Sequence, residues 1–215
     1  MGFLYNSGMK GFLVHGCYDQ STFRTLETLG IENFAFDLRA RSTHLVTFQS
    51  LKEILAGSRI SRAVLMFADD SKETILSALD LLKGSGKTFQ LEFRDKRPAE
   101  FYESIGLPYL WYFSPDGDWE KILRSSRCSG IILPLGHRSL YHDLPHLWTV
   151  LEERALPIYL HAESFEEASF FEGKDDILAS LDLSDEIQTS YRNVDQLRLR
   201  TMKLWRKLNE SPARQ

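Results

Sequence analysis

Four ionisable residues lie inside or at the edge of short apolar segments of this sequence, namely His15, Glu92, His161 and Asp182. Burying such a group among apolar residues is costly unless the group is paired or used. A histidine can accept a proton near neutral pH, and a carboxylate can donate one or orient the histidine. The same nitrogen and oxygen donors suit Zn²⁺ or Mn²⁺, although no H-x-H or HExxH spacing supports a metal site. The residue types therefore permit proton transfer or, as an alternative, metal-assisted hydrolysis.

The segment 83–93 (KGSGKTFQLEF) raises a different possibility, because Gly-Lys-Thr preceded by glycines is typical of a phosphate-binding loop. That loop would need a glycine where this chain has Leu81, and it would follow a strand and open a helix. Here residues 74–82 have a helical pattern and residues 88–93 a strand pattern, so the order is reversed. We predict a helix-to-strand connection with Gly84 ending the helix. No nucleotide site is expected, and no other cofactor.

Eight short β-rich apolar segments alternate with segments of helical periodicity along the whole chain. The expected strands are 11–15, 33–38, 62–68, 88–93, 108–113, 129–134, 157–161 and 177–183. The expected helices are 21–29, 48–56, 72–82, 98–105, 118–125, 145–154, 165–172 and 194–208. Strands begin about every 24 residues, which suits parallel strands joined by crossover helices. The pattern predicts an α/β fold, a single (β/α)₈ TIM barrel domain over residues 1–215, with an open doubly wound sheet as the alternative.

Composition excludes several classes of protein. Hydrophobic residues make up 43% of the chain, which is enough for a large core. The net charge of −4 and the absence of a basic stripe argue against nucleic-acid binding. Two cysteines, Cys17 and Cys128, do not form a disulfide framework, and no apolar segment approaches the ~20 residues that span a membrane. We expect a cytoplasmic protein, and residues 1–10 lack the pattern of a signal peptide.

In a (β/α)₈ barrel the chemistry lies at the carboxyl ends of the strands and in the loops that follow them. In this chain those positions are densely polar, although a solvated rim would be polar too. They hold His15, Cys17, Asp37, Arg39, Arg41, Asp69, Asp70, Glu92, Arg94, Ser114, Pro134, Arg138, His161, Glu163, Asp182, Ser184, Asp185 and Glu186. We expect a small-molecule ligand at this face, whereas Trp111, Tyr112 and Phe113 on the fifth strand are interpreted as packing residues.

Four segments carry a resemblance to a known family: LVHGCY (13–18), GIENFAFDL (30–38), FQLEFRDKRPAEF (89–101) and LDLSDEIQTSYRNVDQLR (181–198). In this order and register they resemble the first, second, fourth and last strand motifs of the phosphoribosylanthranilate isomerases of tryptophan biosynthesis. The resemblance implies a (β/α)₈ barrel and an Amadori rearrangement, in which an aminoaldose becomes an aminoketose. No single motif is specific by itself.

The chain departs from that family at the residues that transfer protons. The family has a cysteine base at the end of strand one, and His15 stands there in this chain. Its aspartate acid at the end of strand six is replaced by Pro134, which has no proton to donate. Histidine can serve as a base, so a working isomerase would need another acid, such as Glu163, Asp182 or Asp37. Cys17 lies two residues beyond the base position and is a weaker candidate that we expect on the same face as His15.

The phosphate site of the family is altered as well. Its Gly-Gly and Ser-Gly pairs after strands seven and eight correspond here to Ala162-Glu163 and Asp185-Glu186. Three carboxylates would repel a phosphate dianion, so we expect no tight binding of the phosphorylated substrate. Asp182 and Ser184 remain where the family contacts the ribose. The residues that we expect to bind a ligand are Asp37, Arg39, Arg41, Glu92, His161 and Ser184, with His15, Asp182 and Glu163 as the catalytic candidates.

Three hypotheses about function follow. The first is a divergent isomerase-like barrel that has lost the general acid and the phosphate site and binds a small molecule or a protein partner. The second is a working aldose–ketose isomerase with His15 as its base. The third is a metal-dependent hydrolase that uses His15, Glu92, His161 and Asp182.

Overall fold

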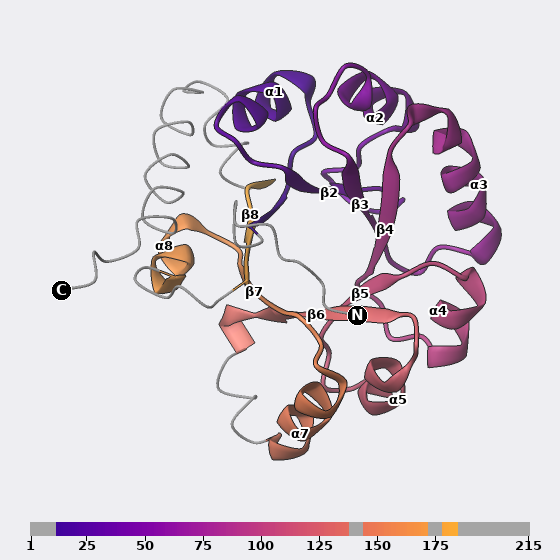
Figure 1. Ribbon diagram of the computed structural model, residues 1–215, viewed down its shortest axis with the longest axis vertical. Coiled ribbons are helices and arrows are strands. Elements are labelled where there is room, and N and C mark those ends of the chain that lie inside the picture. Colours follow the sequence, from indigo (N-terminus) through magenta and orange to yellow (C-terminus); the bar gives the residue numbers. More distant parts are fainter. Residues whose placement is uncertain (1–11, 138–143, 172–177, 185–215) are drawn as a thin grey trace.

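Eight parallel strands close into a barrel in the computed structural model, which describes residues 12–137, 144–171 and 178–184 (Figure 1). Each strand pairs with its neighbours in the chain, and the eighth pairs with the first. The strands are β1 (Leu13–His15), β2 (Asn33–Asp37), β3 (Arg62–Phe67), β4 (Thr88–Phe93), β5 (Tyr109–Tyr112), β6 (Cys128–Pro134), β7 (Ile158–Ala162) and β8 (Leu178–Asp182). The predicted (β/α)₈ TIM barrel is confirmed.

Helices surround the barrel on its outer side (Figure 1). They are α1 (Gln20–Thr28), α2 (Phe48–Leu55), α3 (Lys72–Leu82), α4 (Ala99–Ile105), α5 (Trp119–Arg124), α7 (Pro145–Arg154) and the short α8 (Phe165–Ala168), with 3₁₀ turns η1 (Lys83–Ser85), η2 (Leu135–His137) and η3 (Ser169–Phe171). The side chains of Asp19, Thr47, Ser71 and Ser164 cap the first turns of α1, α2, α3 and α8. The predicted helix 194–208 lies outside the described residues. No helix in the described part of the chain could cross a membrane.

The apolar side chains form two layers. The larger layer fills the space between the strands and the helices, and it includes Phe23, Phe34, Trp111 and Leu147. The smaller layer lies inside the barrel and consists of Leu13, Ala35, Val64, Met66, Leu110 and Ile132. Because side chains alternate along a strand, Leu13 and His15 share one face of β1. The barrel interior therefore changes from apolar to polar toward the carboxyl ends of the strands.

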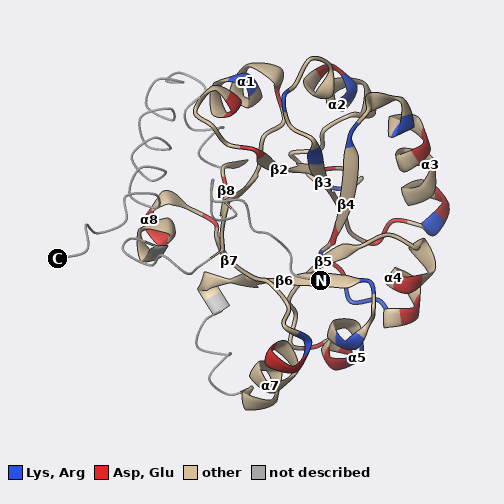
Figure 2. Cartoon of the chain, viewed as in Figure 1, with Lys and Arg blue, Asp and Glu red and all other residues tan. Residues whose placement is uncertain are grey.

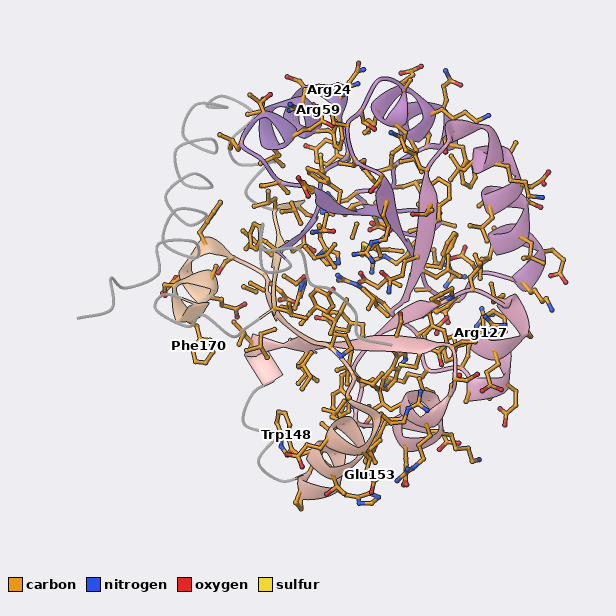
Figure 3. The ribbon with its side chains drawn as sticks, in the orientation of Figure 1. Arg24, Arg59, Arg127, Trp148, Glu153 and Phe170 are labelled. Atoms are coloured by element: carbon orange, nitrogen blue, oxygen red, sulfur yellow. The ribbon has the colours of Figure 1, made fainter. Side chains whose placement is uncertain are left out.

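Charged residues of both signs occur on the outer helices (Figure 2), and some of them link neighbouring βα units. Arg24 on α1 donates to the backbone carbonyls of Ala56, at 2.6 Å, and Gly57, at 3.0 Å. Arg124 on α5 donates to Glu153 on α7 at 2.9 Å. Arg24 and Glu153 lie at the periphery of the molecule, far from the barrel axis (Figure 3). These contacts hold the helical ring together and leave the barrel mouth to other residues.

The segment with the Gly-Lys-Thr sequence is a helix-to-strand connection, as predicted, but Gly84 lies within the 3₁₀ turn and does not end the helix. Helix α3 ends at Leu82, η1 follows, and Gly86 turns the chain with a φ of 69° before β4 begins at Thr88. The ammonium group of Lys87 donates to the carbonyls of Ser58, at 2.9 Å, and Ile60, at 2.8 Å. Lys87 therefore has a structural role in this connection.

Candidate functional site

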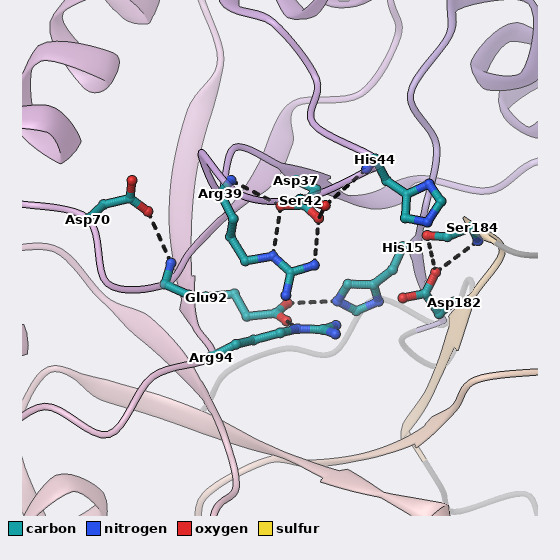
Figure 4. Close-up of polar contacts among 11 residues, drawn as sticks. His15, Asp37, Arg39, Ser42, His44, Asp70, Glu92, Arg94, Asp182 and Ser184 are labelled. Atoms are coloured by element: carbon teal, nitrogen blue, oxygen red, sulfur yellow. Dashed lines mark hydrogen bonds and ion pairs between the residues drawn. The ribbon is translucent and has the colours of Figure 1, made fainter.

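A buried hydrogen bond joins β1 to β4 across the barrel. Nε2 of His15 lies 2.7 Å from Oε2 of Glu92, and both side chains are fully buried (Figure 4). The other carboxylate oxygen, Oε1, accepts a hydrogen bond from Nε of Arg94 at 2.7 Å. His15 and Glu92 are 77 positions apart in the sequence, so only closure of the barrel brings them together. The sequence predicts that Glu92, Asp182 or Glu163 lies within hydrogen-bonding reach of His15, and the structure places Glu92 there.

Ser180 on β8 extends this network to a second histidine. Its Oγ lies 3.0 Å from Nδ1 of His15 and 2.8 Å from Nδ1 of His161 on β7. All three side chains are fully buried. Ser180 was not among the predicted site residues, since an uncharged residue in the body of a strand gives little signal. Ser180 occupies an alternate position with Asp182 and Ser184, and alternate residues of a strand share one face. This spacing could have identified Ser180 from the sequence.

The aromatic ring of Tyr112 on β5 completes the cluster. The guanidinium carbon of Arg94 lies 4.4 Å from the centre of that ring, a cation–π distance. The ring of His161 packs edge-on against Tyr112 at 5.5 Å and against His15 at 4.9 Å. Tyr112 had been interpreted as a packing residue. In the structure it also supports two polar side chains of the site.

The charges of this cluster follow from burial and from the pairing of its members. Burial alone would raise the pKa of Glu92, but His15 and Arg94 outweigh it and hold that pKa well below its usual range. Burial likewise disfavours the charged form of Arg94, yet Glu92 and Tyr112 raise its pKa overall. The pKa of His161 is lowered well below its usual value, first by burial and then by His15 and Arg94. Glu92 and Arg94 are therefore ionised at neutral pH, and His161 is uncharged.

Asp182 and Ser184 form a turn beside this cluster. Oδ1 of Asp182 accepts hydrogen bonds from the backbone nitrogen of Ser184, at 2.9 Å, and from its hydroxyl, at 2.5 Å. Burial would raise the pKa of Asp182, but His15, the Ser184 hydrogen bonds and Arg94 together lower it. Gly16 approaches the same turn with a φ of 79°, where an added Cβ would lie 2.6 Å from Oγ of Ser184. The close approach explains why β1 ends in a glycine turn.

A second cluster surrounds Asp37 at the end of β2 (Figure 4). Arg39 donates to both oxygens of Asp37, at 2.8 and 2.6 Å, and the hydroxyl of Ser42 donates to Oδ2 at 2.6 Å. Burial would raise the pKa of Asp37, but these contacts outweigh it and lower that pKa. The loop borders a cavity of about 420 Å³ that is lined by Arg39, Ala40, Arg41, Ser42, Thr43, His44, Ala68, Asp69 and Asp70. Asp37, Arg39 and Arg41 thus belong to the rim of the barrel.

The remaining candidates lie apart from the buried network or outside the described residues. Glu163 is exposed and accepts a long hydrogen bond of 3.4 Å from the hydroxyl of Tyr112. Cys17 packs in the layer between strands and helices, so the expectation that it shares a face with His15 was wrong. Burial raises the pKa of its thiol, which makes it a poor nucleophile. Pro134 is the last residue of β6. Arg138, Asp185 and Glu186 lie outside the described residues.

The described residues offer no group of three His, Cys, Asp or Glu side chains that could hold a metal ion. His15, Glu92, His161 and Asp182 had been the candidates for such a group. Both ring nitrogens of His15 already have protein partners, and Glu92 is bound to His15 and Arg94. The residues therefore do not fit a metal in this arrangement.

A larger cavity of about 670 Å³ lies at the opposite end of the barrel, near the starts of β2, β3 and β4. Asn33, Arg62 and Thr88 are among its lining residues. None of the ionisable strand-end residues reaches it. The polar network places the candidate site at the carboxyl ends of the strands, where (β/α)₈ barrels carry their chemistry.

The burial of His161 predicts a pH-dependent loss of stability. Its pKa is lowered in the folded state, so the unfolded chain binds the extra proton more readily once the pH falls below about 6.5. Relative to a His161→Phe variant, the protein should lose up to about 1.4 kcal/mol of unfolding free energy per pH unit between about pH 6.5 and 5. Urea unfolding at several pH values measures this difference. Parallel pH curves for the two proteins would contradict the prediction.

Comparison with known proteins gives structural matches. No family model and no curated protein matches the sequence. Phosphoribosyl anthranilate isomerase from Thermotoga maritima matches with a TM-score of 0.68 and 13% identity over 94% of this chain and 99% of that chain. The enzyme from Thermus thermophilus matches with a TM-score of 0.62 and 17% identity over 91% and 100%. A tryptophan synthase structure from M. tuberculosis gives 0.62 and 12% over 90% and 91%. The chain therefore has the (β/α)₈ barrel fold of the phosphoribosylanthranilate isomerases, as its sequence motifs suggested.

Proposed function

We propose that this barrel binds a small polar molecule at the carboxyl ends of its strands and does not catalyse the isomerisation of its structural relatives. The observation that carries the proposal is the state of His15. Its Nε2 is held by Glu92 at 2.7 Å and its Nδ1 faces Ser180 at 3.0 Å, within a fully buried environment. A base whose two nitrogens are both occupied by protein side chains is poorly placed to take a proton from a substrate.

Within the described part of the site, the residues that stand where an acid would be needed support the same proposal. Pro134 stands at the end of β6, where the resemblance places the proton donor. Asp182 is another carboxylate of the site, but its lowered pKa keeps it ionised near neutral pH. A general acid must hold a proton at the working pH. Glu163 is exposed at the rim, and it stands where the resemblance implies a glycine of the family's phosphate site.

A working isomerase is the second candidate, and one observation favours it. A histidine paired with a carboxylate at 2.7 Å is a common arrangement for an oriented base. If the substrate displaces Ser180 from Nδ1 of His15, that nitrogen becomes available. This candidate requires turnover that depends on His15.

Catalysis can be tested in an isomerase-deficient strain that carries the wild-type gene or a His15→Ala variant. We expect no growth without tryptophan in either case. Calorimetry should show no micromolar binding of reduced 1-(o-carboxyphenylamino)-1-deoxyribulose 5-phosphate, the compound present in one solved isomerase complex. Wild-type rescue that is lost in His15→Ala, or micromolar binding, would refute the proposal in favour of the isomerase.

Binding at the proposed face needs its own measurement. Backbone NMR spectra recorded with a panel of small carboxylates, sugar phosphates and amines should show shifts at the ends of β1, β4, β7 and β8. Arg62 and Thr88, at the opposite end of the barrel, serve as internal controls. Shifts confined to that opposite end, or none at all, would contradict binding at the carboxyl face.

A further inference from the structure

The two histidines of the network differ in which of their nitrogens are free. Both nitrogens of His15 and Nδ1 of His161 have protein partners. Among the described residues, Nε2 of His161 is buried without a hydrogen-bond partner, and so is Nη2 of Arg94. Buried polar groups are almost always paired, because an unpaired group loses its hydration without compensation. Two such atoms in one cluster point to a ligand that pairs them.

The two unpaired atoms belong to side chains that both contact the ring of Tyr112. Arg94 lies over the ring of Tyr112 at 4.4 Å, and the ring of His161 packs edge-on against it at 5.5 Å. Tyr112 itself sits at the carboxyl end of β5. Arg94 and His161 therefore adjoin the same ring at the carboxyl end of β5.

His15 acts in this arrangement through Ser180. The serine hydroxyl has one hydrogen, so it can donate to only one of the two histidines and accepts from the other. The proton on Nδ1 of His15 therefore decides which nitrogen of His161 carries a hydrogen. His15 is a positioning residue, and Glu92 fixes its orientation from the other side.

We propose that Arg94 and His161, and not His15, contact the ligand, and that this ligand carries a carboxylate with one oxygen on Nη2 of Arg94. The inference rests on the proposed function and names its ligand class. A guanidinium favours a planar carboxylate as an acceptor. Glu92 and Asp182 already contribute two negative charges to this cluster, and Glu163 lies beside it, in contact with Tyr112. A singly charged carboxylate therefore fits better than a phosphate dianion.

The test uses the full chain with ¹⁵N-labelled histidine, titrated separately with acetate, acetamide and inorganic phosphate. Acetamide has the shape of acetate without its charge, and phosphate is the alternative anion. We expect acetate to shift Nε2 of His161 while the His15 nitrogens move little. Acetamide should bind at least about tenfold more weakly, because it loses a charge-assisted hydrogen bond.

Two variants remove the proposed ligand contacts but keep the groups that contact Ser180 and Glu92 in the folded protein. His161→Asn keeps a polar group beside Ser180 but removes Nε2, and Arg94→Lys keeps a positive partner for Glu92 but removes Nη2. Each should weaken acetate binding at least about fivefold. Arg62→Lys, at the far end of the barrel, should leave acetate binding unchanged. Far-ultraviolet circular dichroism checks that each variant is folded.

Each other outcome counts against the inference in a distinct way. Equal binding of acetate and acetamide, or a first shift on His15, would overturn it. Tighter binding of phosphate would overturn the carboxylate assignment. A shift at His44 without any at His161 would overturn the inference but leave binding at the carboxyl face intact. No shift at that face with any of the three probes or with the broader panel would count against both proposals.

Discussion

Replacing Glu92 with alanine is expected to lower the free energy of unfolding by about 3–5 kcal/mol. The carboxylate is fully buried and binds His15 and Arg94 at 2.7 Å each. Its removal leaves the Arg94 guanidinium buried without its counter-charge, and a buried unpaired charge is among the most costly defects in a protein core. Urea unfolding followed by circular dichroism at neutral pH measures the change.

Two control variants isolate the role of burial and of charge. Lys96 and Asp116 form an ion pair at the same 2.7 Å distance, but both side chains are exposed. Asp116→Ala should therefore lower the free energy of unfolding far less than Glu92→Ala does. Glu92→Gln keeps the shape and a hydrogen-bond acceptor, so its cost should fall between the two. Equal effects of Glu92→Ala and Asp116→Ala would show that the buried network contributes little to stability.

The barrel could be predicted because its signal is local. Each strand is a short apolar segment, and each lies one crossover helix from the next, so the order of the elements implies parallel pairing. His15, Glu92 and His161 stood out because their neighbours along the chain are apolar. The contacts among them were not predictable in the same way, because they depend on register between strands far apart in sequence.

The roles of Ser180 and Tyr112 in the site could not be predicted from the sequence around them. Neither carries a charge at neutral pH, and a serine or tyrosine inside a strand is ordinary in sequence. Their roles appear only when β8 and β5 close around His161. The partner of His15 was narrowed to a few carboxylates by residue type, and barrel geometry then selects Glu92.

The error at Cys17 has a specific backbone cause. The expectation of a shared face with His15 assumes that strand alternation continues through residue 17. Strand β1 ends at His15, and Gly16 then adopts a φ of 79°. The turn redirects the chain, so Cys17 packs toward the helices. A glycine directly after a strand therefore indicates that the alternation of side chains between the two faces stops at that residue.

The second large effect is expected at the same glycine. Replacing Gly16 with alanine should lower the free energy of unfolding by about 2–5 kcal/mol, from two causes that add. A left-handed backbone costs an alanine roughly 1–2 kcal/mol, and overpacking adds about 1–3 kcal/mol. The new Cβ would lie 2.6 Å from Oγ of Ser184 and 2.8 Å from Oδ1 of Asp182, and it would also clash with the Ser184 backbone nitrogen.

Two further glycines separate these causes. Gly86 has a φ of 69° but no atom within 4 Å of an added Cβ, so Gly86→Ala should show the backbone cost alone. Gly84 also has open space around it and lacks a positive φ, so Gly84→Ala should change stability by no more than about 0.5 kcal/mol. The expected order of destabilisation is Gly16, then Gly86, then Gly84, measured by urea unfolding. If Gly16→Ala cost no more than Gly86→Ala, the turn of Asp182 and Ser184 would have to move away from the new methyl group at little cost in free energy. The close contact at the barrel mouth would then not hold that turn in place.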